Sequence, residues 1–101
     1  MNQRIDQERR ELLATFYSLY ADQIRLVVAR SLRPEDRHQA DDIAQDVWLT
    51  AWQYLLRGND IRNPRALLSQ MARHRVVDHY RSARVRREVP VDTTARELVA
   101  A

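Results

Sequence analysis

Two aspartates one helical turn apart, Asp42 and Asp46, are the first residues of this chain whose type and spacing could do chemistry. Such a carboxylate pair can act in general acid and base catalysis or bind a metal ion. No His or Cys stands at matching spacing in the same segment. A solvated acidic helix face is the plainer interpretation. Leu49, one turn further on, favours a protein-docking surface, because an interface needs an apolar centre within a polar rim.

A second pair, His74 and Asp78 at positions i and i+4, has the spacing of two metal ligands. No third ligand is evident beside them, so a metal site is disfavoured. The sequence therefore predicts no catalytic residues, no metal site and no cofactor. Nothing in it indicates ATP hydrolysis, and we expect the protein not to be an enzyme.

Arginines are concentrated in residues 62–87, which hold eight of them against a single acid, Asp78. Hydrogen-bonding and stacking groups stand between these arginines at Gln70, His74 and Tyr80. This density exceeds the usual charge balance of a protein surface, and it favours nucleic-acid binding over a merely solvated helix face. All seventeen basic residues are Arg, for which a genome rich in G and C is a simpler explanation than selection for guanidinium chemistry.

Both groups of residues lie on predicted helices, each with one apolar face and one polar stripe at spacings of three and four residues. The first, which we call the acidic stripe, consists of Asp42, Gln45, Asp46, Leu49 and Gln53. The second, the arginine stripe, consists of Gln70, Arg73, His74, Val77, Arg81 and Arg84. Each stripe has one aliphatic residue near its middle, and their different charges predict two different partners.

Three main helices are needed to position these stripes. The first helix is predicted from about Gln7 to Leu32, and Pro34 then interrupts the helical pattern. Its apolar face is formed by Leu13, Phe16, Tyr17, Tyr20, Ile24, Val27 and Val28. Asp36 and Gln39 have the spacing of a capping box for the second helix, and Gly58 is placed to end that helix.

The second helix is expected to bury Ile43, Ala44, Val47, Trp48, Ala51, Trp52 and Leu55. Its tryptophans could stack on bases, but their place on the apolar side favours core packing. Asn63 followed by Pro64 is a start signal for the third helix, which continues to about Arg87. Its core face is Leu67, Leu68, Met71, Ala72 and Val76. Arg75 falls near that face, so we expect it either to snorkel or to pair with an acid on another helix.

With 101 residues, 45% of them hydrophobic, one Gly and three Pro, the chain is expected to form one compact all-α domain over residues 1–88. Residues 89–101 are expected to be a linker or tail, with one marginal turn after Thr94. The absence of Cys excludes disulfides and thiolate metal sites, and it fits a reducing cytoplasm. The apolar run from Leu26 to Ala29, which no other run exceeds in length, is too short for membrane insertion.

The segment ADDIAQDVWLTAW at residues 40–52 resembles the core-polymerase-binding segment of bacterial extracytoplasmic-function sigma factors. PRALLSQMARHRVVDHYR at residues 64–81 resembles the promoter-melting, minus-ten-reading helix that follows it in that family. Order, spacing and intervening loop agree, and the resemblance covers about Phe16 to Arg87. ADDIAQD followed by an I-R-x-P-R-A-x-L phrase is similar to the iron-starvation (ferric-citrate type) subgroup.

This resemblance implies the all-α region 2 fold and a role in transcription initiation, with core RNA polymerase and promoter DNA as partners. It implies that Asp41, Asp42, Gln45 and Asp46 dock on the clamp-helix coiled coil of the largest polymerase subunit, with Leu49 and Gln53 in the same surface. The arginine stripe would capture the non-template strand of the minus-ten element, together with the loop residues Arg57, Asn59, Asp60, Arg62 and Asn63. An anti-sigma factor is a further implied partner, and the expected location is the cytoplasm.

The loop from Arg57 to Asn63 is expected to form the wall of a pocket for one flipped base. Ile61 in this loop either pins it to the core or contacts the base. The family usually has Asn at the position of His74 and Trp at the position of Leu67. A complete family member continues into a helix-turn-helix domain that reads the minus-35 element, and this chain stops at Ala101. It would be a fragment, a naturally short protein, or one whose second domain is supplied elsewhere.

One alternative function stays open from the residues themselves. A helical adaptor, such as a target of an anti-sigma factor, would use the acidic and basic faces to join two protein partners and would bind no DNA. Binding of a single-stranded minus-ten oligonucleotide with steep salt dependence separates the two.

Overall fold

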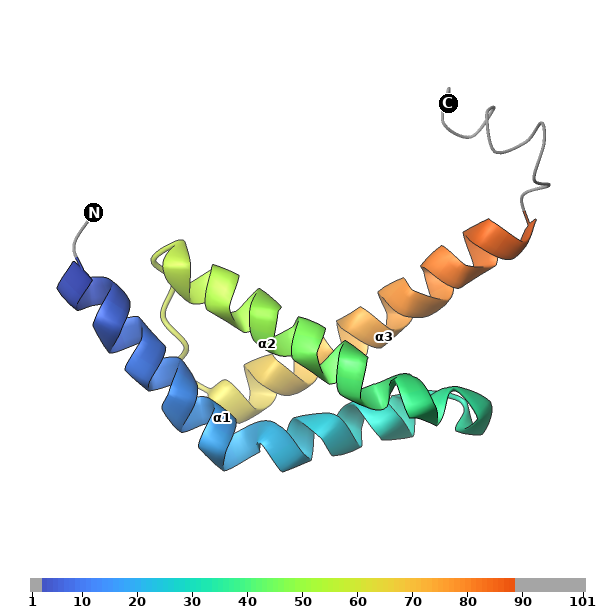
Figure 1. Ribbon diagram of the computed structural model, residues 1–101, viewed down its shortest axis with the longest axis horizontal. Coiled ribbons are helices and arrows are strands. Elements are labelled where there is room, and N and C mark those ends of the chain that lie inside the picture. Colours follow the sequence, from blue (N-terminus) through green and yellow to red (C-terminus); the bar gives the residue numbers. More distant parts are fainter. Residues whose placement is uncertain (1–2, 89–101) are drawn as a thin grey trace, which may run out of the picture.

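The computed structural model describes residues 3–88, which form three α-helices and one 3-10 helix (Figure 1). The elements are α1 (Gln3–Ser31), η1 (Pro34–Gln39), α2 (Ala40–Leu56) and α3 (Pro64–Glu88). No strand occurs within this part of the chain. The predicted all-α fold with three main helices is confirmed. The linker expected at residues 89–101, with its turn after Thr94, lies outside the described residues.

α1 begins at Gln3, four residues earlier than the sequence predicts. Nothing at the start of the chain breaks a helix, and Asp6 lies in the first turn, where a carboxylate interacts favourably with the positive end of the helix dipole. The helix bends near its middle (Figure 1). Within this helix, the Thr15 hydroxyl donates a hydrogen bond of 3.0 Å to the Glu11 carbonyl.

The connection between α1 and α2 differs from the prediction. Asp36 and Gln39 do not form a capping box: Gln39 is the N-cap residue of α2 and makes no side-chain hydrogen bond there. Residues Pro34–Gln39 form η1 instead, and the Ala40 amide donates to the Arg37 carbonyl as η1 runs straight into α2. Because a backbone carbonyl accepts the amide hydrogen bond at the start of α2, the Asp36 carboxylate is free to bind a different partner.

The predicted end of the second helix and the predicted start of the third, on either side of the loop from Arg57 to Asn63, are confirmed. Gly58 has a φ of +94°, in the left-handed region that glycine adopts without strain, and its amide donates to the Leu55 carbonyl at 3.0 Å. Asn63 caps α3 through its side-chain oxygen, which accepts the Ala66 amide hydrogen bond at 3.3 Å. Pro64 is the first residue of α3, where its missing N–H costs nothing.

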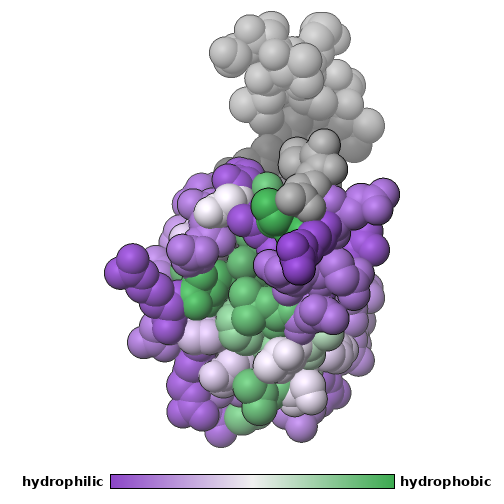
Figure 2. Space-filling model, turned by 90° about the vertical axis from the view of Figure 1, so that its left-hand side faces the viewer, coloured by the Kyte–Doolittle hydropathy of each residue, from purple (hydrophilic) through white to green (hydrophobic). Residues whose placement is uncertain are grey.

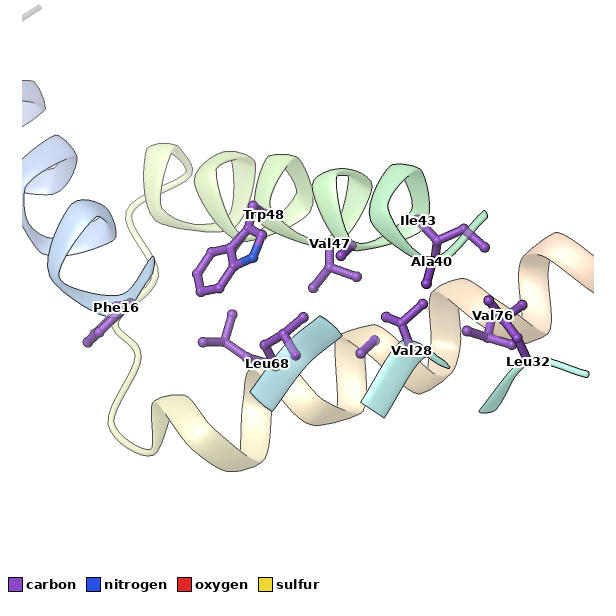
Figure 3. Close-up of a cluster of buried hydrophobic side chains, with 13 residues drawn as sticks. Phe16, Val28, Leu32, Ala40, Ile43, Val47, Trp48, Leu68 and Val76 are labelled. Carbon is purple, nitrogen blue, oxygen red and sulfur yellow. The ribbon is translucent and has the colours of Figure 1, made fainter. Parts of the chain in front are cut away.

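The core lies where α2 packs across α1 and the first half of α3 (Figures 1 and 3). Its fully buried residues include Ile24, Val28, Val47, Leu55 and Leu68, each of which contributes roughly 1.5 to 3 kcal/mol by burial. Trp48 points into this core, as predicted, and is 7% exposed. Tyr17 departs from the prediction, since it is 46% exposed. Trp52 is only half-buried.

One polar contact ties α1 to α3 beside this core. The Gln23 side-chain amide donates a hydrogen bond of 3.2 Å to the Ser69 hydroxyl, and Ser69 is a buried polar residue. A buried hydroxyl without a partner would oppose folding, so this bond stabilises the packing of the helix that carries the arginine stripe.

Candidate functional site

The acidic stripe lies on the outer face of α2, as the helical wheel predicts. Asp42, Gln45 and Gln53 are exposed, and Asp46 is partly exposed. Leu49 is 54% exposed in their midst. The expected arrangement of an apolar centre within a polar rim is therefore present.

Two of the acids on this face are already paired within the domain. Asp41 accepts a hydrogen bond of 2.6 Å from Nε of Arg25 on α1, and this bond raises the pKa of the Arg25 guanidinium. Asp46 Oδ2 lies 2.9 Å from Nη2 and 3.3 Å from Nε of Arg75 on α3. Of the two possibilities that the sequence leaves for Arg75, pairing with an acid on another helix is confirmed. Asp42 is the acid of the stripe for which residues 3–88 supply no such partner.

An open apolar groove of about 640 Å³ adjoins the acidic stripe between α1 and α2. It is lined by Arg10, Leu13, Ala14, Tyr17, Gln45, Trp48, Leu49 and Trp52. The rings of Tyr17 and Trp48 meet edge to face with centroids 5.1 Å apart, so Tyr17 packs on the core although it is exposed. Figure 2 shows an apolar band framed by polar residues on the face at the left-hand side of Figure 1.

The arginine stripe is exposed along α3. Gln70, Arg73, His74, Arg81 and Arg84 face solvent, and Val77 is 53% exposed among them. Arg73, Arg81 and Arg84 line one hollow of about 410 Å³, with Tyr80 and Val77 in its walls. On the other flank of α3, a hollow of about 290 Å³ is lined by Thr50, Leu67, Gln70, Met71, His74, Arg75 and Asp78. The helix thus offers shallow concave surfaces with guanidinium groups at their edges.

The loop from Arg57 to Asn63 uses part of its hydrogen-bonding capacity to hold its own shape. The Asn59 side-chain amide donates to the Tyr54 carbonyl at 3.1 Å, at the end of α2, and Asn63 caps α3. Ile61 is half-buried and packs against the core, which favours the pinning role considered from the sequence. Arg57, Asp60 and Arg62 are exposed. The three hollows described here are lined by residues of the helices rather than by this loop.

Tyr80, which the sequence offers as a stacking group between the arginines, has an internal role that sequence reasoning missed. Its hydroxyl donates to Asp36 Oδ2 at 2.7 Å and accepts the Arg33 amide hydrogen bond at 2.8 Å. The Arg33 guanidinium lies 4.9 Å from the centre of its ring. These contacts join α3 to the connection between α1 and α2. No local signal could have found them, because Tyr80 is 44 residues from Asp36.

No group of three or more His, Cys, Asp or Glu side chains within residues 3–88 is arranged to hold a metal ion. His74 and Asp78 line one hollow together with Arg75, whose positive charge opposes cation binding. Within the same residues, no helix is long and apolar enough to cross a membrane.

The fold and these surfaces define a small helical domain with an acidic face on one helix and an arginine-rich face on the next. A family model for sigma-70 region 2 matches residues 16–86, which is more than half of the chain. The chain belongs to the sigma-70 region 2 family. Region 2 acts in transcription initiation, through binding of RNA polymerase and promoter melting. Neither the curated proteins nor the solved structures give a significant match.

Proposed function

We propose that this chain is the region 2 domain of an extracytoplasmic-function sigma factor of the iron-starvation type, acting in the cytoplasm. ADDIAQD at residues 40–46, followed by IRNPRALL at residues 61–68, supports the subgroup. The observation that carries the mechanism is the pair of exposed stripes on α2 and α3. They differ in charge, and each contains an exposed aliphatic residue, Leu49 or Val77.

The acidic stripe, together with Asp41, would dock on the clamp helices of the largest polymerase subunit. Leu49 supplies the apolar centre of this contact, and the adjoining groove with Tyr17 and Trp52 extends it. Asp42 and Gln45 form the polar rim that sets orientation, because charged rim groups steer association and reject wrong partners.

The arginine stripe would hold the non-template strand of the minus-ten element. Arg73, Arg81 and Arg84 suit phosphate contacts, while Gln70 and His74 reach base edges. Flipping a base out of the duplex costs a few kcal/mol, and each stacked base returns roughly 1 to 3 kcal/mol. Capture of unstacked bases would therefore drive melting without ATP. The loop residues Arg57, Asn59, Asp60, Arg62 and Asn63 would contribute to base selection.

The DNA assignment is tested by fluorescence anisotropy with a labelled single-stranded minus-ten oligonucleotide. Arg73→Ala and Arg81→Ala should each weaken binding and reduce the slope of log affinity against log salt by about 0.7, because each removes about one phosphate contact. Arg10→Ala is the matched control, since Arg10 is exposed on α1 in the groove beside α2. Unchanged affinity and slope in both stripe variants would contradict the assignment and favour the adaptor function.

The polymerase assignment is tested by binding of core polymerase to the immobilised domain. Asp42→Arg should abolish or greatly weaken binding, because the new cation would face a basic partner surface. Leu49→Ala should weaken it by removing the apolar centre. Glu8→Arg makes the same charge change on an exposed residue of α1 and should have little effect. Capture of polymerase by Asp42→Arg at wild-type strength would refute this docking surface.

A further inference from the structure

One ion pair joins the two proposed binding surfaces. Asp46 belongs to the acidic stripe on α2, and Arg75 lies beside the arginine stripe on α3. Arg75 makes two hydrogen bonds to the same carboxylate oxygen, 2.9 Å from Nη2 and 3.3 Å from Nε. Both side chains remain about half exposed, at 44% for Arg75 and 45% for Asp46. An incoming partner can therefore reach either member of the pair.

Arg75 is also positioned to contact a nucleic acid. It lines the hollow of about 290 Å³ that Gln70 and His74 of the arginine stripe also line. In the free domain the Asp46 carboxylate offsets its charge, so Arg75 attracts a phosphate less strongly than Arg73 and Arg81 do, for which the described residues show no ion pair. If Asp46 took another cation as its partner, the Arg75 guanidinium would become available beside those two side chains.

We propose that Arg75 is an additional DNA-contacting residue that Asp46 holds in reserve until polymerase docks. The inference rests on the proposed function. A basic group of the polymerase binds Asp46 and releases Arg75 to the captured strand, so each partner strengthens binding of the other, as linkage requires. Asp78, three residues further along α3 and in the same hollow, competes for the released arginine and limits the gain.

The size of the effect follows from the exposure of the pair. Half-exposed ion pairs contribute little, and the gain in DNA affinity on releasing Arg75 should be at most about fivefold. Asp46→Asn removes the negative charge that holds Arg75 and nearly keeps the shape of the side chain. Asp42→Asn removes the same charge from the same helix face, at an acid for which the described residues show no ion pair. Any excess effect of Asp46→Asn over Asp42→Asn measures the release.

The test compares wild type, Asp46→Asn, Asp42→Asn, Arg75→Gln and the Asp46→Asn/Arg75→Gln double variant of the full chain. Anisotropy with the single-stranded minus-ten oligonucleotide gives the affinity of each, with and without core polymerase. Asp46→Asn should raise the affinity of the free domain about two- to fivefold and more than Asp42→Asn does. In the Arg75→Gln background this excess should vanish. Core polymerase should raise DNA affinity less in Arg75→Gln than in wild type.

Equal effects of Asp46→Asn and Asp42→Asn, or an excess that persists without Arg75, would overturn the reserve role while leaving DNA binding by the stripe intact. Failure of the wild type to bind the oligonucleotide, both alone and with core polymerase, would overturn the proposed function as well. Circular dichroism checks that each variant is folded. Arg75→Met, which keeps the aliphatic part of the side chain, replaces Arg75→Gln if that variant is unstable.

Discussion

Tyr80→Phe should destabilise the domain although it removes a single oxygen atom. The Tyr80 hydroxyl donates to the Asp36 carboxylate at 2.7 Å and accepts a hydrogen bond from the Arg33 amide at 2.8 Å. Phenylalanine keeps the ring and its contact with the Arg33 guanidinium. The substitution therefore isolates the two hydrogen bonds that fasten α3 to the connection between α1 and α2.

A hydrogen bond contributes about 0.5 to 1.5 kcal/mol to stability, and one to a charged group about 1.5 to 3 kcal/mol. Arg33 is exposed and Asp36 is only partly buried, so water replaces part of what is lost. We expect the free energy of unfolding to fall by about 1 to 2 kcal/mol in total. For a domain of this size, the Tm drops about 4 to 8 °C for each kcal/mol.

This stabilisation should also depend on pH. Burial, together with the hydrogen bond to Asp36, raises the pKa of the Tyr80 hydroxyl, and the bond from the Arg33 amide opposes part of this rise. Because its pKa is higher in the folded state, the folded protein holds this proton more tightly than the unfolded chain. The contribution is complete below about pH 10 and is lost as the pH rises further. The stability difference between wild type and Tyr80→Phe should therefore shrink at alkaline pH.

Urea and thermal unfolding, followed by circular dichroism, measure these effects. Tyr20→Phe is the matched control, because Tyr20 is also half-buried against the core and residues 3–88 supply no hydrogen bond to its hydroxyl. A double-mutant cycle with Asp36→Ala gives the coupling between the two side chains. Equal stability of Tyr80→Phe and Tyr20→Phe, with no coupling to Asp36, would refute the reasoning.

Three further predictions concern the core and the loop. Leu68→Ala should cost about 2 to 5 kcal/mol in urea unfolding, because Leu68 is fully buried, whereas Leu19→Ala at a site 66% exposed should cost little. Gly58→Ala should lower stability by about 1 kcal/mol, through its φ of +94° alone, since an added Cβ meets no atom within 4 Å; an unchanged Tm would contradict this. Exchanging residues 57–63 for another family member's loop should change the preferred base at one minus-ten position, while total affinity stays within about 1 kcal/mol. A binding series with each of the four bases at that position measures the preference. An unchanged preference would show that the loop is only a connector.

The features that were predicted correctly from the sequence depend on residues close together in the chain. Helical periodicity placed Leu49 and Val77 on the solvent side of their helices, and both are more than half exposed. The Gly58 amide and the Asn63 side chain mark the ends of helices through hydrogen bonds to residues three positions away. Such signals act within one turn of helix, so a single sequence contains all the information that they need.

The features that it missed depend on tertiary contacts. Asp36 stands at capping-box spacing before a helix, and only the position of Tyr80 on another element shows that its carboxylate has a different partner. Arg75 is an intermediate case. The helical wheel showed that Arg75 must either snorkel or pair with an acid on another helix. Only the crossing of α2 and α3 selects pairing, with Asp46 rather than Asp42.

The length of α3 explains why the Tyr80 contacts bear on function as well as on stability. The helix is about 37 Å long at 1.5 Å per residue, and Val76 is the last buried residue among its described side chains. Arg81 and Arg84 lie beyond the core, so the orientation of that end depends on how the helix is held just before it. Tyr80 is held there through Asp36 and Arg33. Loss of its hydroxyl should therefore loosen the far part of the arginine stripe more than the near part at Arg73, which the core already fixes.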